Sequence, residues 1–242
     1  MKILAQTAIV FAAALLFSIP AIAVAQDGET AAPEGDFDIS VTVTGVSDYR
    51  FRGVSLSDKD PAIQGAVDVE HKSGIYGGIW ASTIKNSPAD VEADLYAGWR
   101  GNAGSVDLDV GATAYLYPSG ANLDYYEILA SASYTLGPAE LKLGAGYSPA
   151  QDNLGGNDNI YGYTDIGVGI PSTPVTVKGH VGYEDGSLAG PTGQKWDWSL
   201  GAEVVVDRFT LGVSYVDTNI DRIFDPRKLA GAGVVASVSV GF

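Results

Sequence analysis

The sequence VVASVSVGF, residues 234–242, alternates apolar residues with small or polar ones and closes on an aromatic residue. A β-strand places successive side chains on opposite faces, so this alternation predicts a strand with one apolar face and one polar face. Such a strand is typical of a transmembrane β-barrel, whose outer face meets lipid and whose inner face meets water. An edge strand of a soluble sandwich has the same local pattern, so the rest of the sequence must distinguish the two.

Similar alternation recurs from Phe37 onward in segments of about ten residues separated by turn signals. We expect strands over residues 37–52, 61–71, 74–84, 91–101, 104–117, 123–136, 138–149, 159–170, 173–184, 194–206, 208–218 and 231–242. The predicted connections alternate between short and long, as in barrels with short periplasmic turns and longer external loops. The sequence therefore predicts an all-β protein, with one closed antiparallel transmembrane barrel of about 12 strands over residues 37–242.

The start of the chain has the pattern of a secretory signal. Lys2 precedes the apolar run 8–17, and small residues at Ala23 and Ala25 offer a cleavage site. We expect cleavage after Ala25, with cleavage after Ala23 as the alternative, which makes residues 1–25 a signal peptide. A retained membrane anchor is the weaker interpretation, because the apolar run is short and interrupted.

Composition narrows the classes of partner. The chain carries 14 Lys and Arg against 29 Asp and Glu, a net charge of −15. This acidity argues against binding to nucleic acid or to an anionic lipid surface, and it is compatible with an acidic lumen, acidic loops or a cation-binding surface. Cys is absent, so disulfides do not contribute to the stability of the exported chain. Residues 26–36 are small, polar and acidic, and we expect them to form a flexible periplasmic lead-in.

One long motif lies at the start of the predicted barrel. Residues 45–65 read GVSDYRFRGVSLSDKDPAIQG, followed by SGIYGGIWAS at 73–82 and EADLYAG at 92–98. These stretches resemble the opening motif of the TorF-like porin family, proteobacterial outer-membrane proteins otherwise of unknown function. The resemblance implies a porin in the outer membrane of a Gram-negative bacterium, and it supplies neither catalytic residues nor a substrate. Beyond residues 45–100 the likeness is one of pattern and length, including the terminal Phe242.

The motif contains a charged cluster. Asp48, Arg50 and Arg52 fall on one face of the first predicted strand if the alternation holds. As a functional group, they would set a transverse field that sorts ions in a pore. The alternative, favoured by the cost of unpaired buried charge, is that the arginines pair with carboxylates such as Asp68 or Glu70 on the next strand.

The alternation places a set of ionisable side chains on the inner faces of the strands. They are Asp68, Glu70, Glu92, Asp94, Asp107, Asp109, Glu127, Asp165, Asp197, Glu203, Lys142, Lys178 and His180. With Asp48, Arg50 and Arg52 they predict a cation-biased path for passive diffusion of small hydrophilic solutes or ions.

A filled interior is the alternative to a pore. Barrels of about eight strands leave little internal space and barrels of about sixteen leave a channel, so a twelve-stranded barrel lies between them. The large side chains of Tyr115, Tyr125 and Tyr163 are expected to point inward and could narrow the lumen. A filled barrel would be a non-conducting outer-membrane protein whose external loops bind a partner.

No catalytic site is expected. His71 lies beside a predicted periplasmic turn, and His180 shares a face with Glu184, but no Ser is tied to either His by a motif. A barrel enzyme is therefore the weakest of the three functional hypotheses. Residues 217–221 offer oxygen ligands for Ca²⁺, but Arg222 stands where a calcium loop needs Gly, so we expect neither a metal nor a cofactor.

The last residue suggests one further partner. An aromatic side chain at the final position, here Phe242, resembles the signal that the barrel-assembly machinery reads. The expected partners are that machinery during biogenesis, outer-membrane lipid, and small solutes or ions. The pattern does not distinguish a monomer from a trimer.

Overall fold

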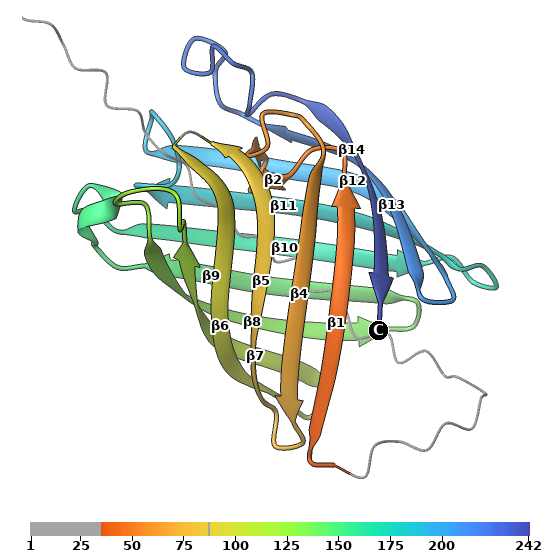
Figure 1. Cartoon of the computed structure of the whole chain (residues 1–242). Helices are drawn as coiled ribbons and strands as arrows, with labels where there is room; N and C mark the ends of the chain where they lie inside the picture. Colours follow the sequence, from red (N-terminus) through yellow and green to blue (C-terminus); the bar gives the residue numbers. More distant parts are fainter. Residues whose placement is uncertain (1–34, 87) are drawn as a thin grey trace, which may run out of the picture.

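The computed structural model describes residues 35–86 and 88–242, and within them twelve strands form one closed antiparallel barrel (Figure 1). The strands are β1 (Phe37–Val46), β4 (Ala62–His71), β5 (Ile75–Asn86), β6 (Ala89–Ala103), β7 (Val106–Leu116), β8 (Tyr125–Leu136), β9 (Ala139–Ser148), β10 (Asn159–Gly169), β11 (Val175–Gly186), β12 (Gln194–Val206), β13 (Phe209–Thr218) and β14 (Gly233–Gly241). The predicted fold class is confirmed. The predicted signal peptide, its cleavage at Ala25 and nearly all of the lead-in lie outside the described residues.

Each barrel strand pairs with its neighbours in the sequence, and β1 pairs with β14 to close the sheet. Phe242 extends this closing seam, because its N–H donates to the carbonyl of Val41 at 2.9 Å. Closure leaves no unpaired strand edge, which is a condition for a sheet that meets lipid. Residues 35–86 and 88–242 contain no helix that could span a membrane.

The outer surface of the barrel is apolar. Exposed large side chains recur at every second position, for example Ile39, Val41 and Val43 on β1 and Leu211 and Val213 on β13. A soluble monomer rarely exposes so extended an apolar surface, whereas a barrel in a membrane requires one facing lipid. The structure is that of a membrane-spanning barrel.

Connections of different length gather at opposite ends of the barrel. The short-turn end, as we call it, carries the tight connections after β4, β6, β8, β10 and β12. The long-loop end carries residues 47–61, 117–124, 149–158, 187–193 and 219–232. The predicted sorting of turns by length is present, with one correction. Residues 85–90, between the third and fourth predicted strands, were expected to form a long loop, but β5 and β6 extend into this segment and pair Asn86 with Ala89 after a register shift.

The segment between β1 and β4 departs from the predicted strand. Instead of continuing to residue 52, β1 ends at Val46, and residues 47–61, hereafter the inserted loop, fold into the long-loop end of the barrel (Figure 1). The inserted loop contains a hairpin of two short strands, β2 (Arg50–Phe51) and β3 (Val54–Ser55).

A two-residue hairpin turn reverses the chain within the inserted loop. Arg52 and Gly53 connect β2 to β3 with φ angles of 43° and 84°. Positive φ at both central residues is the geometry of a two-residue hairpin turn, and it reverses the chain. A Cβ at Gly53 would also lie 2.2 Å from Cγ2 of Thr218, so the close approach to β13 leaves no room for a side chain.

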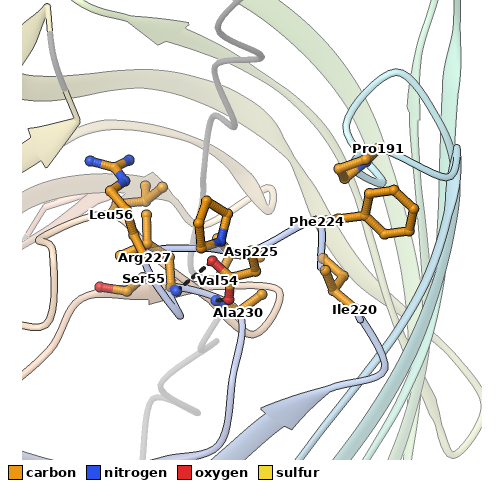
Figure 2. Close-up of a pocket in the computed structure, with 11 residues that line it drawn as sticks. Val54, Ser55, Leu56, Pro191, Ile220, Phe224, Asp225, Arg227 and Ala230 are labelled. Atoms are coloured by element: carbon orange, nitrogen blue, oxygen red, sulfur yellow. Dashed lines mark hydrogen bonds between the residues drawn. The ribbon is translucent and has the colours of Figure 1, made fainter. Parts of the chain in front are cut away.

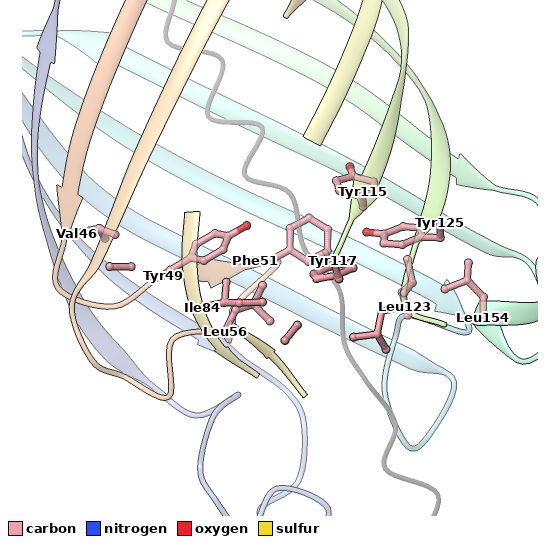
Figure 3. Close-up of a cluster of buried hydrophobic side chains, with 13 residues drawn as sticks. Val46, Tyr49, Phe51, Leu56, Ile84, Tyr115, Tyr117, Leu123, Tyr125 and Leu154 are labelled. Carbon is pink, nitrogen blue, oxygen red and sulfur yellow. The ribbon is translucent and has the colours of Figure 1, made fainter. Parts of the chain in front are cut away.

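The inserted loop creates an apolar core inside the barrel at the long-loop end (Figure 3). Tyr49, Phe51 and Leu56 of the loop are buried against aromatic wall residues that include Tyr115 and Tyr125. Tyr49 and Tyr115 are both 0% exposed. This half of the lumen is packed with side chains in the structure.

Candidate functional site

Backbone hydrogen bonds hold the inserted loop in the lumen. Ser55 donates its N–H to the carbonyl of Leu229, and Lys85 donates its N–H to the carbonyl of Leu56, both at 2.8 Å. These two bonds tie the loop to the 219–232 connection on one side and to β5 on the other. The loop thereby presents its charged side chains to the inner wall.

Arg52, at the tip of the hairpin, binds two carboxylates of the wall. Its Nη2 lies 2.6 Å from Oε2 of Glu127 on β8, and its Nη1 lies 2.5 Å from Oε1 of Glu184 on β11. The guanidinium also lies over the rings of Phe51 and Tyr161, at 4.5 and 4.0 Å from the two centroids. The side chain of Arg52 is 5% exposed and both carboxylates are 0% exposed, so the contacts form away from bulk water.

Lys195 on β12 strengthens the same site. Its Nζ lies 2.6 Å from Oε2 of Glu184 and donates to the backbone carbonyl of Arg52 at 2.9 Å. Asn159 on β10 donates to Oε1 of Glu184 at 3.0 Å. Glu184 therefore accepts contacts from two cations and an amide. Removing one partner of such a buried ion pair typically costs about 3–5 kcal/mol, because the other charge is left uncompensated.

Arg50 binds within the inserted loop and to the last long connection. Its Nε lies 2.7 Å from Oδ2 of Asp48, and its Nη1 donates to the carbonyl of Gly231 at 2.6 Å. Ser55 donates its hydroxyl to Oδ1 of Asp48 at 2.6 Å. Arg50 and Asp48 therefore form a local ion pair that supports the shape of the loop.

The structure corrects the predicted partners of the two arginines. Both pair with carboxylates, but neither meets Asp68 or Glu70. Those two residues pair with Ser40 and Asp38 near the start of β1, whereas the inserted loop follows the other end of that strand. Asp68 instead accepts a hydrogen bond from Tyr96 at 2.5 Å, and Glu70 lies 3.1 Å from Arg100. The face pattern of residues 48–52 resembled a strand, but these residues belong to the inserted loop.

A second buried group lies beside the inserted loop, on β6. Glu92 accepts hydrogen bonds from the hydroxyls of Tyr49 at 3.1 Å and Tyr117 at 3.2 Å. Asp94, two residues along the same face, is 4% exposed, and its Oδ1 has no hydrogen-bond partner among the described residues.

The half of the lumen toward the short-turn end is charged and partly open to solvent. His180 lies between Asp165, at 2.5 Å, and Asp197, at 3.0 Å. Its side chain is 24% exposed. Lys178 and Glu203 form a further ion pair at 2.5 Å with similar exposure. Water therefore reaches charged groups in this half, in contrast to the packed half around the inserted loop.

Tyrosines in the lumen lie against glycines of the neighbouring strands. A Cβ built on Gly144 would lie 2.2 Å from Cζ of Tyr163, and one on Gly78 would lie 2.5 Å from Oη of Tyr96. These contacts require the absence of a side chain at the glycines. The glycines thus allow the rings to lie along the wall, where they take less of the lumen.

The ionisable residues predicted to face the lumen occupy three environments. Buried at the level of the inserted loop are Glu92, Asp94, Glu127 and Asp197; partly exposed toward the short-turn end are Asp68, Glu70, Asp109, Lys142, Asp165, Lys178, His180 and Glu203; exposed at that end is Asp107. Sequence reasoning did not select Glu184, Lys195 or Tyr161 for the site. Their positions in the alternation carry the inward signal, but Glu184 and Lys195 fall at the ends of their predicted strands.

A small cavity of about 140 Å³ opens beside the inserted loop (Figure 2). It lies between Val54 and Leu56 of the loop and Ile220 and Phe224 of the 219–232 connection. Its lining is mainly apolar, and Asp225 is engaged with the N–H groups of the same connection. In the described part of the chain, no group of three or more His, Cys, Asp or Glu side chains could hold a metal ion.

Comparisons with known proteins agree with this architecture. A family model described as "Bacterial protein of unknown function (Gcw_chp)" matches residues 30–241. No curated protein matches the chain. Among solved structures, a NanC porin is similar with a TM-score of 0.56 and 11% identity, covering 85% of this chain and 99% of that one.

Two further solved structures have the same fold. A KdgM porin in complex with disordered oligogalacturonate has a TM-score of 0.56 and 8% identity, covering 84% of this chain and 98% of that one. An outer membrane channel from Pseudomonas putida F1 has a TM-score of 0.50 and 11% identity, covering 88% and 97%. At these identities the likeness establishes the fold alone, which is the fold of outer-membrane porins and channels.

Proposed function

The chain belongs to the Gcw_chp family of bacterial proteins of unknown function, and we propose that it is a porin-like channel of the Gram-negative outer membrane. The channel would conduct small hydrophilic solutes or ions by passive diffusion, with a bias for cations. One observation carries the proposal: an apolar outer surface encloses a lumen lined with ionisable side chains, among which carboxylates outnumber Lys and Arg. The side chains proposed to govern selectivity are the ionisable residues that the sequence predicts to face the lumen, together with Asp48, Arg50 and Arg52.

The charge of the lumen argues for the cation bias. Inward carboxylates lower the energy of a cation in a narrow path and raise that of an anion. Oligogalacturonate, the ligand of the similar KdgM porin, is an acidic sugar chain. The acidic inner wall of this chain does not suit such a polyanion, so the proposed solutes differ from that ligand.

Under this proposal the inserted loop is the constriction of the channel. It lies at the long-loop end, which we place outside the cell, and its stretch of sequence carries most of the resemblance to the TorF-like porins. We further propose that residues 1–25 are a signal peptide cleaved after Ala25, that residues 26–36 are a periplasmic lead-in, and that Phe242 is read during barrel assembly. All three suit a chain exported to that membrane.

A non-conducting barrel is the second candidate function. The observation that favours it is the packing at the inserted loop, where Tyr49, Glu92, Tyr115 and Glu127 are 0% exposed. If the inserted loop never moves, this layer would block the lumen, and the external loops would bind a partner instead. We propose no catalytic role for the lumen histidine.

Conductance of the refolded protein in a planar lipid bilayer tests the proposal. Under a KCl gradient, we expect discrete open levels and a reversal potential of the sign that cation preference produces. Circular dichroism of the same preparation confirms that the barrel has folded. A folded barrel that stays electrically silent in every salt would overturn the channel and favour the non-conducting alternative.

A further inference from the structure

The contacts of Arg52 resemble those between a receptor and a ligand. The groups that receive its guanidinium belong to three wall strands: Glu127 on β8, Tyr161 on β10 and Glu184 on β11. We call these three side chains the cation cage. Arg52 belongs to the inserted loop, so the cage and its occupant come from parts of the fold with different backbone support. The wall strands are paired on both sides, whereas the loop is tied by a few bonds.

The chemistry of the cage is selective for planar or compact organic cations. Two carboxylates at 2.6 and 2.5 Å satisfy the two terminal nitrogens of the guanidinium, and an aromatic ring at 4.0 Å stacks on its face. Charge-assisted pairs and cation–π contacts are strongest where water is excluded, and both carboxylates are 0% exposed. A hydrated inorganic ion would lose its water without gaining the stacking contact.

Electrostatics require a cation in the cage. Lys195 compensates one charge of Glu184, so without Arg52 the pair Glu127 and Glu184 retains an excess negative charge in a buried position. An uncompensated buried charge is costly, so an empty cage is disfavoured. A solute cation that replaced Arg52 would exchange one set of ion pairs for another, and the net cost of displacing the loop would be correspondingly small.

We propose that the cation cage is a binding subsite for solutes that carry a guanidinium or primary ammonium group, and that Arg52 occupies it as an intramolecular competitor. The inference rests on the proposed channel, since the solute must enter the lumen to reach the cage. Binding of the solute keeps the tip of the inserted loop out of the cage and prolongs the open state of the constriction. Without such a solute, Arg52 leaves and re-enters the cage, so the channel opens in KCl alone but for shorter periods.

Chemical rescue of Arg52→Ala with guanidinium tests this inference. In detergent, low millimolar guanidinium chloride should raise the thermal unfolding midpoint of R52A above that in NaCl of equal ionic strength. Wild type should show no such difference, because its own arginine fills the cage at a high effective concentration. Arg208→Ala, which removes an exposed arginine at a short turn, is the matched control and should behave as wild type.

The second readout is electrical. R52A should conduct more than wild type in the bilayer. Guanidinium in the cage neutralises the excess negative charge of Glu127 and Glu184 without restoring the loop contact. The K⁺ current should therefore fall part of the way toward that of wild type, with half of the change at a concentration equal to the dissociation constant. Both effects of guanidinium should disappear in R52A with Glu127→Gln, since the cage then lacks one carboxylate. If R52A does not fold, Arg52→Lys is the fallback variant. It keeps a cation but has a single nitrogen in place of the two that contact Glu127 and Glu184, so guanidinium should raise the unfolding midpoint of R52K more than that of wild type.

The outcomes separate the two proposals. The cage would be overturned if guanidinium and NaCl gave R52A the same thermal unfolding midpoint. It would also be overturned if guanidinium shifted the midpoints of R52A and R208A equally. A thermal shift specific to R52A without any conductance would keep the cage and overturn the channel. Conductance in R52A that guanidinium does not alter would leave the channel standing and remove the cage.

Discussion

At the residue scale, the two motif arginines have different roles although they are separated by a single residue. Arg50 pairs with Asp48 inside the inserted loop, whereas Arg52 crosses the lumen to Glu127 and Glu184. The difference follows from the hairpin turn, which carries Arg52 to the tip of the loop. Among the described residues of the loop, Arg52 is the one whose ion pairs reach β8 and β11.

Arg50→Glu combined with Arg52→Glu should increase both conductance and cation preference. The Arg52 change places a third carboxylate against Glu127 and Glu184, and the repulsion should expel the loop tip from the wall. The measurement is single-channel current and reversal potential in a KCl gradient. Arg208→Glu carries the same charge change at an exposed turn and should alter neither. Unchanged ion selectivity in the double variant would refute a role of the two arginines.

Gly144→Ala should reduce conductance with little loss of stability. The added methyl group would lie 2.2 Å from the ring of Tyr163, which is the end of a flexible side chain and must move away from the wall into the lumen. Gly162→Ala on β10 is the control, because a Cβ there meets nothing within 4 Å. We expect the free energy of unfolding to change by about 1 kcal/mol or less in both variants. Equal conductance of the two variants would contradict a water path beside Tyr163.

At the element scale, strands were predicted well because their signal is local. A period of two is visible in any ten residues, and it indicates both the strand and its lipid-facing side, as in Val106–Leu116 of β7. The inserted loop was predicted poorly for the same reason. Residues 48–52 alternate charged and aromatic side chains as a strand does, but the barrel strand has ended at Val46 and a turn at Arg52 and Gly53 reverses the chain.

Replacing residues 47–61 with a short Asn-Gly turn should give a folded barrel of higher conductance. Val46 already pairs with Ala62, so a tight turn can join β1 to β4 without altering the ladder. Single-channel recording and circular dichroism check the two parts of this prediction. Shortening the 149–158 connection, which lies at the same end, should leave conductance near the wild-type value. A loop-deleted barrel that remains silent would show that the lumen is blocked elsewhere.

At the scale of the whole molecule, the contrast between the outer and inner surfaces makes the barrel stable in a membrane. The outer face buries apolar side chains in lipid, while ion pairs and hydrogen bonds satisfy much of the inner face. The strand pairs close without an edge, so every strand contributes to both surfaces. A charge placed outward should therefore cost far more than the same charge placed inward.

Leu200→Arg should destabilise the barrel by about 2–4 kcal/mol, as expected for a cation near the middle of the lipid face. Leu200 lies at the centre of β12 and is 63% exposed on the outer surface. Its neighbour Ser199 faces the lumen, and Ser199→Arg should cost much less. Urea unfolding in lipid vesicles measures both values. Similar costs for the two variants would contradict the assignment of the lipid-facing side.

Local alternation was enough to predict the twelve barrel strands, their faces and, apart from 85–90, which connections are short and which are long, because each depends on residues close together in the chain. The path of residues 47–61 and the carboxylates that meet Arg52 became known from the folded structure alone. Glu127 and Glu184 lie 75 and 132 residues away from it, on strands that become neighbours of the loop only once the barrel has closed. The local alternation of side chains does not predict these contacts. They depend on the curvature of the closed sheet and on a hairpin turn that reverses the chain into the lumen.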